Sequence, residues 1–309
     1  MADQHAKTQP KGTTDLHGKT ALITGASSGI GLEASASIAG MGAEVVMVAR
    51  DRARGEAALA EVARRSGSSS VSLLLCDFSS QASIRKLAEE IRAKHARLDI
   101  LINNAGGVSD RRRVTGDGIE QTFAVNHLGY FLLTNLLLDV VVASAPARIV
   151  SVASVGHYRG DLDFDDLGFA KGGYSIMKAY SRSKLANVLF TRELARRLAG
   201  KNVTATCLHP GAVATNIWSG APVWAKPLLA VAKRVFMISP AEGGSRIVYL
   251  ATSPAVEGKS GGYYDKNAEK KPATLALDDA LARRLWDESA RLVGLPSDEA
   301  GQGASSAAR

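Results

Sequence analysis

Short apolar segments alternate with longer segments of helical spacing over most of the chain. The apolar runs cover residues 20–23, 44–49, 71–76, 98–102, 147–152 and 203–208. They are apolar at consecutive positions, which is typical of parallel strands that helices cover on both faces. The segments between them repeat apolar residues every three or four positions, as amphipathic helices do, over 32–41, 54–65, 83–95, 118–141 and 184–198.

This alternation predicts an α/β fold: a Rossmann-type, doubly wound parallel sheet with helices on both faces. Tyr263 and Tyr264 follow two glycines and are predicted to form a last strand, which makes about seven. No internal repeat is present. We expect a single catalytic domain over 18–295, a flexible N-terminal segment over 1–17 and a flexible tail over 296–309.

The net charge of +8 comes from arginines scattered in pairs and triplets along the 309 residues. No aromatic residues are interleaved with them, as a nucleic-acid groove would need. We interpret the charge as solvated helix faces and expect no nucleic-acid partner.

No apolar run reaches the ~18–20 residues of a membrane span, and residues 1–20 contain no apolar signal core. We therefore expect a cytoplasmic protein with no stable membrane insertion. Cys76 and Cys207 fall in strand-like runs and are expected to be buried free thiols. No metal site is expected.

A glycine-rich turn lies between the first predicted strand and the first predicted helix. Its sequence is Thr24-Gly25-Ala26-Ser27-Ser28-Gly29-Ile30-Gly31. Glycines let the backbone turn sharply and approach a pyrophosphate, and the helix N-terminus offers free N–H groups. The turn therefore predicts a dinucleotide site, with Gly25, Ser27, Ser28, Gly29, Ile30 and Gly31 as binding residues.

The spacing G-x-x-x-G-x-G resembles the cofactor loop of the short-chain dehydrogenases/reductases, and further motifs follow in that family's order. They are Asp77 with Phe78, Asn103-Asn104-Ala105-Gly106, Asn126, Ser154, Tyr180 with Lys184, and His209-Pro210-Gly211 through Thr215. The likeness covers about residues 15–295. Asn126-His127-Leu128-Gly129 and Ser183-Lys184-Leu185-Ala186-Asn187 are most similar to the retinol dehydrogenase-like branch. The N-terminal membrane anchor that some of those enzymes carry is not expected here.

The resemblance implies a role for each catalytic candidate. Tyr180 is expected to be the general acid in reduction and the general base in oxidation. A tyrosine pKa near 10 is too high for this work, so the Lys184 ammonium is expected to lower it and to bind the nicotinamide ribose. Ser154 would hold the substrate oxygen, and Asn126 would support the lysine through a water. Cofactor contacts are implied for Asp77, Phe78, Asn104, Ala105, Gly106, Pro210, Gly211, Val213 and Thr215.

Two alternatives compete with these assignments. Tyr174 and Lys178 form a second Tyr-x-x-x-Lys pair, but Tyr174 lies beside two glycines in a predicted loop. Ser151 competes with Ser154, although a strand points the two side chains to opposite faces. We favour Tyr180 and Ser154. An insertion over 160–173 separates them, as in the retinol dehydrogenase-like branch.

The end of the second strand favours NADP(H) over NAD(H), which remains the alternative. Position 49 is Ala49, where NAD enzymes usually carry a carboxylate, and Arg50 suits a 2′-phosphate. Asp51 is interpreted as a helix-capping residue. Ser28 lacks the basic charge that some NADP-dependent members carry in the turn.

The substrate is expected to be a small-molecule alcohol or carbonyl of apolar character. Residues 212–238 hold an apolar stripe at helical spacing, formed by Trp224, Leu228, Val231 and Val235. A substrate lid is the functional interpretation; packing on the core and shallow membrane contact are the alternatives. The resemblance implies a homodimer or homotetramer that pairs through 118–141 and 184–198. An epimerase or dehydratase of the extended branch and a non-catalytic NADP-binding sensor are the rival functions.

Overall fold

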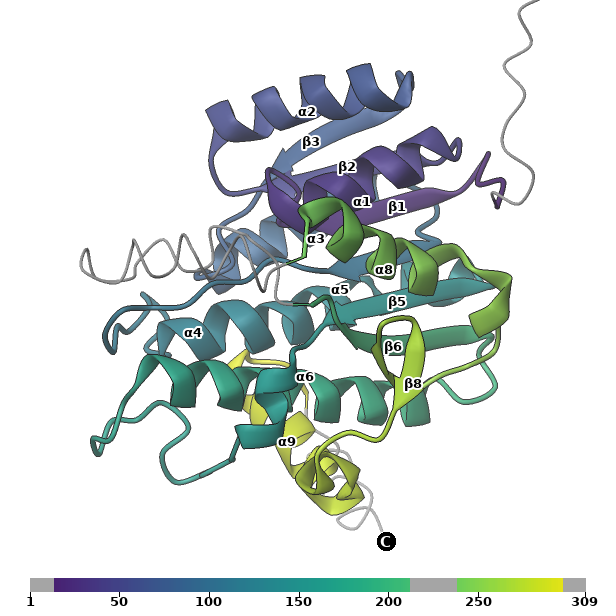
Figure 1. The fold of residues 1–309 in the computed structure, drawn as a ribbon. Coiled ribbons are helices and arrows are strands. Elements are labelled where there is room, and N and C mark those ends of the chain that lie inside the picture. The colour runs from purple at the N-terminus through teal and green to yellow at the C-terminus, as the bar shows by residue number, and fades with distance from the viewer. Residues whose placement is uncertain (1–13, 212–237, 297–309) are drawn as a thin grey trace, which may run out of the picture.

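One sheet forms the centre of the computed structural model, which describes residues 14–211 and 238–296 (Figure 1). The strands are β1 (Thr20–Thr24), β2 (Glu44–Ala49), β3 (Val71–Leu75), β4 (Ile100–Asn103), β5 (Ala147–Val152), β6 (Val203–His209), β7 (Tyr263–Asp265) and β8 (Ala268–Lys270). Their order is β3-β2-β1-β4-β5-β6-β7-β8. Strands β1 to β7 pair in parallel, and β8 pairs antiparallel with β7. The order reverses between β1 and β4, where open α/β sheets bind their ligands.

Helices cover both faces of this sheet. The α-helices are α1 (Gly29–Gly40), α2 (Arg52–Ser66), α3 (Gln81–Lys94), α4 (Gln121–Phe123), α5 (Gly129–Ala143), α6 (Ile176–Arg197), α8 (Pro240–Thr252) and α9 (Asp279–Leu292). A π-helix, η1 (Ala124–Leu128), joins α4 to α5. The 3-10 helices are η2 (Val155–Arg159), η5 (Pro254–Val256) and η6 (Thr274–Leu277).

Strand side chains alternate between two hydrophobic clusters. Leu22 and Val46 point to the cluster that contains α3, α5, α6 and α9, whereas Ile23 and Met47 point to the one that contains α1, α2 and α8. Because both faces are covered, every residue of β1 is buried, and so is every residue of β2 after its first. This double burial produces the continuous apolar runs of the sequence.

The predicted Rossmann-type fold is confirmed, with one more strand than expected. β8 was missed because its three residues are all exposed and carry no hydrophobic pattern. α6 begins at Ile176, before the predicted range of 184–198, and Ser175 is its N-cap residue. The side chains of its first turn are mostly exposed, so this turn shows no apolar spacing in the sequence. Asp51 caps α2 as predicted, and its carboxylate accepts from Arg54 N at 2.9 Å. The division into 1–17, 18–295 and 296–309 stays a prediction.

The middle stretches of the two helices predicted to pair between subunits are covered within the chain. Residues 181–191 of α6 and 126–134 of η1 and α5 are all buried. α9 packs on α6, and its Trp286 lies in the same hydrophobic cluster as Phe131 and Phe190. These stretches offer no face to a second copy, whereas the later turns of α5 and α6 are partly exposed. Oligomerisation stays a prediction.

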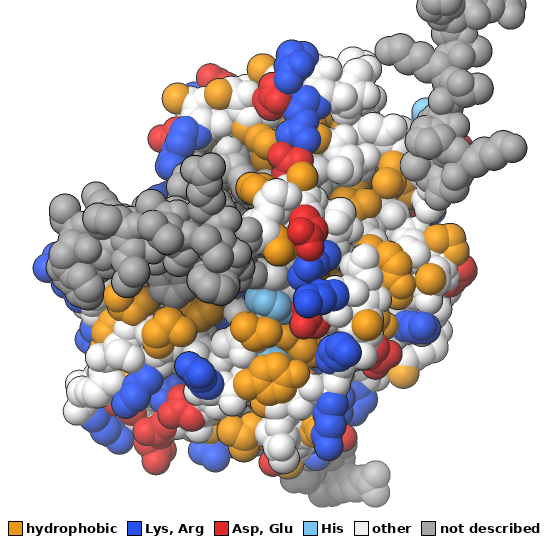
Figure 2. Space-filling view, in the orientation of Figure 1, with side chains coloured by type: hydrophobic (Ala, Val, Ile, Leu, Met, Phe, Trp, Pro, Cys, Tyr) orange, Lys and Arg blue, Asp and Glu red, His pale blue; other side chains and the backbone are white. Residues whose placement is uncertain are grey.

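One helical stretch of the described residues, Gln121–Ala143, is long and apolar enough to cross a membrane by length and composition alone. In the structure, 61% of the most apolar part of this stretch is buried, as is usual for the core helix of a globular fold. On the face seen in Figure 2, acidic and basic side chains are interspersed rather than gathered by sign. This agrees with the interpretation of the net charge as solvated helix faces. Cys76 and Cys207 are buried, as predicted.

Trp286→Ala should lower the free energy of unfolding by about 3–5 kcal/mol, the usual cost of removing a large aromatic side chain from a core. Trp286 is 7% exposed, stacks on Phe190 with ring centres 5.8 Å apart and meets Phe131 edge-on at 4.9 Å. Urea unfolding measures the loss. Leu275→Ala, at a 47% exposed position, is the control and should cost less than about 0.5 kcal/mol. Equal losses in the two variants would contradict the packing of α9.

Candidate active site

The glycine-rich turn packs against the segment that follows β4. Gly25 and Gly29 have φ of 66° and 58°, a conformation that only glycine adopts without steric cost. A Cβ on Gly31 would lie 2.5 Å from both Gly25 O and Asn104 Nδ2. The Asn104 amide donates to Thr24 O at 2.8 Å and to Gly25 O at 3.2 Å. The turn and the Asn104 segment therefore form one close-packed unit that requires glycine.

The start of α1 fits the pyrophosphate of a dinucleotide. Ser28 is the N-cap residue, with extended backbone and no cap hydrogen bond from its side chain. The first N–H groups of α1 therefore keep their donors for another acceptor, at the positive end of the helix dipole. Nearby glycine backbone allows close approach. The residues that would hold the cofactor here are Gly25, Ser27, Ser28, Gly29, Ile30 and Gly31.

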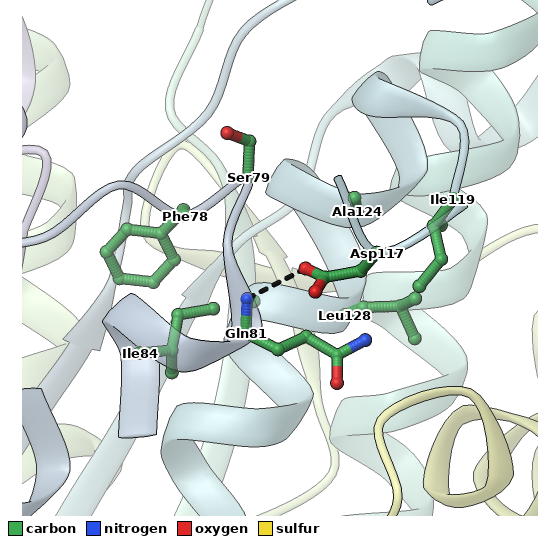
Figure 3. Close-up of a pocket in the computed structure, with 9 residues that line it drawn as sticks. Phe78, Ser79, Gln81, Ile84, Asp117, Ile119, Ala124 and Leu128 are labelled. Carbon is green, nitrogen blue, oxygen red and sulfur yellow. Dashed lines mark hydrogen bonds between the residues drawn. The ribbon is translucent and has the colours of Figure 1, made fainter. Parts of the chain in front are cut away.

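Asp77 and Phe78 follow β3, where the adenine contact is predicted. The Asp77 carboxylate accepts from Ser79 N at 2.9 Å and from Ser79 Oγ at 2.8 Å. A Cβ on Gly129 would lie 2.6 Å from Phe78 Cδ1, so glycine lets this ring pack on α5. Figure 3 shows the small crevice at this ring, lined by Phe78, Ile84, Ala124 and Leu128 among others. None of the catalytic candidates lines it, so it is not the substrate cleft.

Ser154 and Tyr180 meet just beyond the carboxyl end of β5. Ser154 is the N-cap residue of η2, and its Oγ accepts from Gly156 N at 3.1 Å. The Tyr180 hydroxyl, from α6, is hydrogen-bonded to the Ser154 side chain. A Cβ on Gly156 would lie 3.2 Å from Tyr180 Cε1, so glycine at this position makes room for the phenol ring. The two hydroxyls can therefore reach one substrate oxygen.

Lys184 lies one turn after Tyr180 on the same helix face. Its Nζ donates to Val152 O at 2.8 Å and lies 5.7 Å from the centre of the Tyr180 ring. Burial lowers the pKa of Lys184 to about 7. Burial also raises the pKa of Tyr180, and the hydrogen bond to Ser154 offsets part of that rise. The expected net fall of the phenol pKa is therefore wrong for this structure, because desolvation dominates and raises it.

Asn126 lies in the π-helix η1, a form of helix that often marks functional sites. Its Oδ1 accepts from Gly107 N at 2.8 Å, and its Nδ2 donates to Gly107 O at 2.9 Å and to Ser183 Oγ at 3.1 Å. The Ser183 hydroxyl in turn donates to Tyr180 O at 2.7 Å. Asn126 therefore ties the segment after β4 to the helix that carries Tyr180.

The alternative catalytic residues lie elsewhere. The Tyr174 hydroxyl, ahead of α6, donates to Ser109 O at 2.9 Å, and Lys178 is exposed. Ser151 is buried inside β5, between β4 and β6. The geometry favours Tyr180 with Ser154, and the assignment of the site residues stays a prediction.

The sequence profile of the short chain dehydrogenase family matches residues 19–225, which is more than half of the chain. The chain belongs to the short-chain dehydrogenase/reductase family. Retinol dehydrogenase 14 of Homo sapiens is 46% identical over 295 residues, which cover 91% of this chain and 88% of that protein. Retinol dehydrogenase 13 of Homo sapiens is 42% identical over 284 residues, with 91% and 86% covered.

Solved structures of similar fold agree with this membership. An uncharacterized protein from Mycobacterium Paratuberculosis superposes with a TM-score of 0.73 at 31% identity, covering 91% of this chain and 96% of that one. The Pseudomonas aeruginosa RhlG/NADP active-site complex gives 0.63 at 27% identity, with 81% and 94% covered. As a short-chain dehydrogenase/reductase, the chain is an NAD(P)-dependent oxidoreductase of alcohols or carbonyls.

The insertion over 160–173 is hydrogen-bonded to α6, the helix that carries Tyr180 and Lys184. Arg182, between Tyr180 and Lys184, is 3% exposed and donates to Asp166 O at 2.7 Å and to Leu167 O at 3.0 Å. Its guanidinium also binds the Asp161 carboxylate at 3.2 Å. These contacts tie the insertion to α6 at a residue between the two catalytic candidates of that helix.

The loop after β6, predicted to grip the nicotinamide, is described only at its start. Pro210 is buried, and Gly211 has φ of 103°. A Cβ on Gly211 would lie 3.1 Å from Arg246 Nη1 of α8. Val213, Thr215 and residues 212–237 of the predicted lid lie outside the described residues.

Two buried polar residues near the site were missed by the sequence analysis. The Tyr130 hydroxyl has no hydrogen-bond partner among the described residues, and its ring centre lies 5.8 Å from Lys184 Nζ. Asn187 Nδ2 donates to Asn126 O at 2.9 Å and to Val152 O at 3.3 Å. Helical spacing could have revealed Asn187, since it lies one turn beyond the predicted catalytic pair. Residues 14–211 and 238–296 contain no His, Cys, Asp and Glu group that could hold a metal ion.

Proposed function

We propose that this enzyme interconverts bulky apolar alcohols and carbonyls with NADP(H), using Tyr180 as general acid in reduction and general base in oxidation. One observation carries the proposal. The hydroxyls of Ser154 and Tyr180 meet beside the buried ammonium of Lys184, at the carboxyl ends of the strands where the glycine-rich turn also lies. A non-catalytic NADP-binding sensor is the alternative, and nothing in that function calls for such a group of hydroxyls.

The chemistry follows from the protonation states of these groups. NADPH, when bound, supplies the hydride. Ser154 orients the carbonyl oxygen of the substrate. Because the pKa of Tyr180 is raised, its phenol is protonated and can give its proton to the oxygen as negative charge develops there. Lys184, with Nζ 5.7 Å from the ring centre, favours the phenolate that results. Alcohol oxidation runs through the same groups in reverse.

The apolar substrate class rests on three observations. The relatives named retinol dehydrogenases support it. Val155 and Met177, which lie close in sequence to Ser154 and Tyr180, are exposed apolar side chains at 46% and 47%. The stripe within 212–238 supports it from sequence alone, with core packing and membrane contact as alternatives. Retinoids, steroids and lipid aldehydes are the candidate substrates, and the natural substrate is a small molecule rather than a nucleic acid.

The proposed NADP preference rests on Arg50. It is exposed immediately after β2, beside the dinucleotide site. The neighbouring Asp51 carboxylate caps α2 through Oδ1, and position 49, where NAD enzymes usually carry a carboxylate for the ribose 2′-hydroxyl, is Ala49. The solved neighbour described as an NADP complex supports the same preference.

Tyr180→Phe should lower kcat for NADPH-dependent reduction at least about 100-fold, because it removes the proton donor. Cofactor affinity should change little. The measurement follows NADPH absorbance with carbonyls of rising hydrophobicity, retinal included. Tyr174→Phe is the matched control: it loses the hydrogen bond to Ser109 O, away from Ser154 and Lys184, and should stay active. An active Tyr180→Phe with an inactive Tyr174→Phe would reverse the assignment, and no turnover of any carbonyl by the wild type would favour the sensor.

Arg50→Asp should shift the ratio of kcat/KM for NADPH over NADH toward NADH by about 10-fold or more, since a charge-assisted hydrogen bond is worth ~1.5–3 kcal/mol. The change removes the phosphate partner and creates an acceptor for the ribose hydroxyl. Arg64→Asp, the same charge change at the far end of α2, should leave the ratio unchanged. An unchanged ratio in Arg50→Asp would refute the role of Arg50.

A homodimer or homotetramer in the cytoplasm remains our expectation from the family resemblance. Copies would have to pair through a surface other than the covered face of α6. Light scattering at micromolar concentration measures the assembly. A monomer would contradict the expectation and would fit the covering of α6 by α9.

A further inference from the structure

Two histidines, His127 and His157, are completely buried on either side of the proposed catalytic residues, each 0% exposed. Neither has a role in the proposed chemistry. Burial lowers the pKa of His127 to about 4 and also lowers that of His157. Both rings are therefore neutral at neutral pH, so each carries a proton on only one of its two nitrogens.

His157 links Ser154 to the C-terminal part of the chain. Its Nε2 accepts from Ala273 N at 3.1 Å, so this nitrogen carries no proton. Nδ1, 2.7 Å from Ser154 O, is therefore the donor. The ring is packed between Tyr158 and Tyr263, with ring centres 4.0 and 4.5 Å away. His157 thus holds the backbone that carries the Ser154 hydroxyl.

His127 makes an equivalent link on the lysine side of the site. The Asn187 amide nitrogen donates to the carbonyls of Asn126 and Val152, so its Oδ1 faces His127 Nδ1 at 3.3 Å. An amide oxygen only accepts, which makes Nδ1 the donor. Nε2 accepts from Ser289 Oγ at 2.9 Å. The Val152 carbonyl is the same one that accepts the catalytic ammonium.

Both rings thus donate a hydrogen bond from Nδ1 toward the catalytic residues. Both accept a hydrogen bond at Nε2 from residues 271–292, which we call the C-terminal segment. It comprises η6, α9 and the residues before them. Tyr158 donates its hydroxyl proton to Lys271 O at 2.7 Å, and Trp286 stacks on Phe190 of α6. In each ring, Nε2 accepts a hydrogen bond and therefore carries no proton. The proton then resides on Nδ1, so each ring is held in its Nδ1–H tautomer.

We propose that the C-terminal segment is a positioning element of the active site, which holds Ser154 through His157 and the carbonyls around Lys184 through His127 and Asn187. The proposal rests on the proposed function, because positions are defined relative to the reaction at Tyr180. Loss of either donor from the segment frees its ring to change tautomer or turn. The catalytic side then loses the Nδ1–H bond while the fold keeps its core.

Ala273→Pro tests the His157 link without touching the site. Ala273 has φ of −54°, which the proline ring adopts, but the ring Cδ would take the place of the amide hydrogen that meets His157 Nε2. The change therefore removes the donor and displaces the imidazole. We expect kcat to fall about 10-fold, as small misplacements of reacting groups do, with the KM for NADPH unchanged. Ser289→Ala removes the donor to His127 and should also lower kcat. Wild-type kcat in both variants, with both folded, would overturn the proposal.

Two substitutions of His157 separate positioning from simple packing. His157→Asn keeps a donor near the Nδ1 position, whereas His157→Gln keeps only a group at the Nε2 position. Both should lower Tm, but kcat should fall about 10-fold only in His157→Gln. Equal kcat in the two variants would overturn the assignment. His17→Gln, at a side chain 71% exposed, is the control and should change neither quantity.

The same assay separates this inference from the proposed function. Turnover by the wild type and its loss in Tyr180→Phe are measured first. If the wild type turns over no carbonyl, the proposed function fails and the positioning role falls with it. If the wild type is active and Tyr180→Phe is not, wild-type kcat in Ala273→Pro, Ser289→Ala and His157→Gln refutes the positioning role alone.

Discussion

A buried amino group must have a hydrogen-bond partner, and the carbonyl of Val152 is the partner of Lys184. The lysine side chain is only 3% exposed, and its Nζ lies 2.8 Å from that oxygen. Leaving such a group unpaired in the interior costs several kcal/mol. The end of β5 and the register of α6 are therefore fixed relative to each other. Tyr180 lies one turn before the lysine and Ser154 two residues after Val152, so the same constraint brings the two hydroxyls together.

Hydrogen bonds of a few other buried polar atoms connect Lys184 and Val152 to further elements of the fold. Asn187 donates to the same carbonyl and to Asn126 O, which places the π-helix and α6 in one hydrogen-bonded unit. α9 then closes over α6, so that the chain itself covers part of the helix surface predicted to pair with a second copy. Stability and site geometry are coupled as a consequence, because the C-terminal segment that covers α6 also carries the donors that the buried histidines need.

The sequence could predict those parts that depend on local pattern. Strands buried on both faces read as apolar runs, and the glycine-rich turn needs glycine for steric reasons that spacing alone reveals. The exposed β8 left no such pattern. The links through His157 to Ala273 and through His127 to Ser289 join residues 116 and 162 positions apart, so no local motif encodes them. The pKa of Tyr180 was expected to fall because its lysine neighbour is visible in the sequence, whereas the desolvation that raises it depends on the packed structure.

Transfer of deuterium tests the central claim most directly. NADPH labelled at the transferable position of the nicotinamide, on each face in turn, is incubated with the wild-type protein and an apolar aldehyde. One of the two labels should appear on the former carbonyl carbon of the alcohol, because the hydride goes to a substrate whose oxygen lies between Ser154 and Tyr180. Tight binding of NADPH, with no deuterium in any alcohol across the panel of carbonyls, would contradict the account and identify the chain as a cofactor sensor.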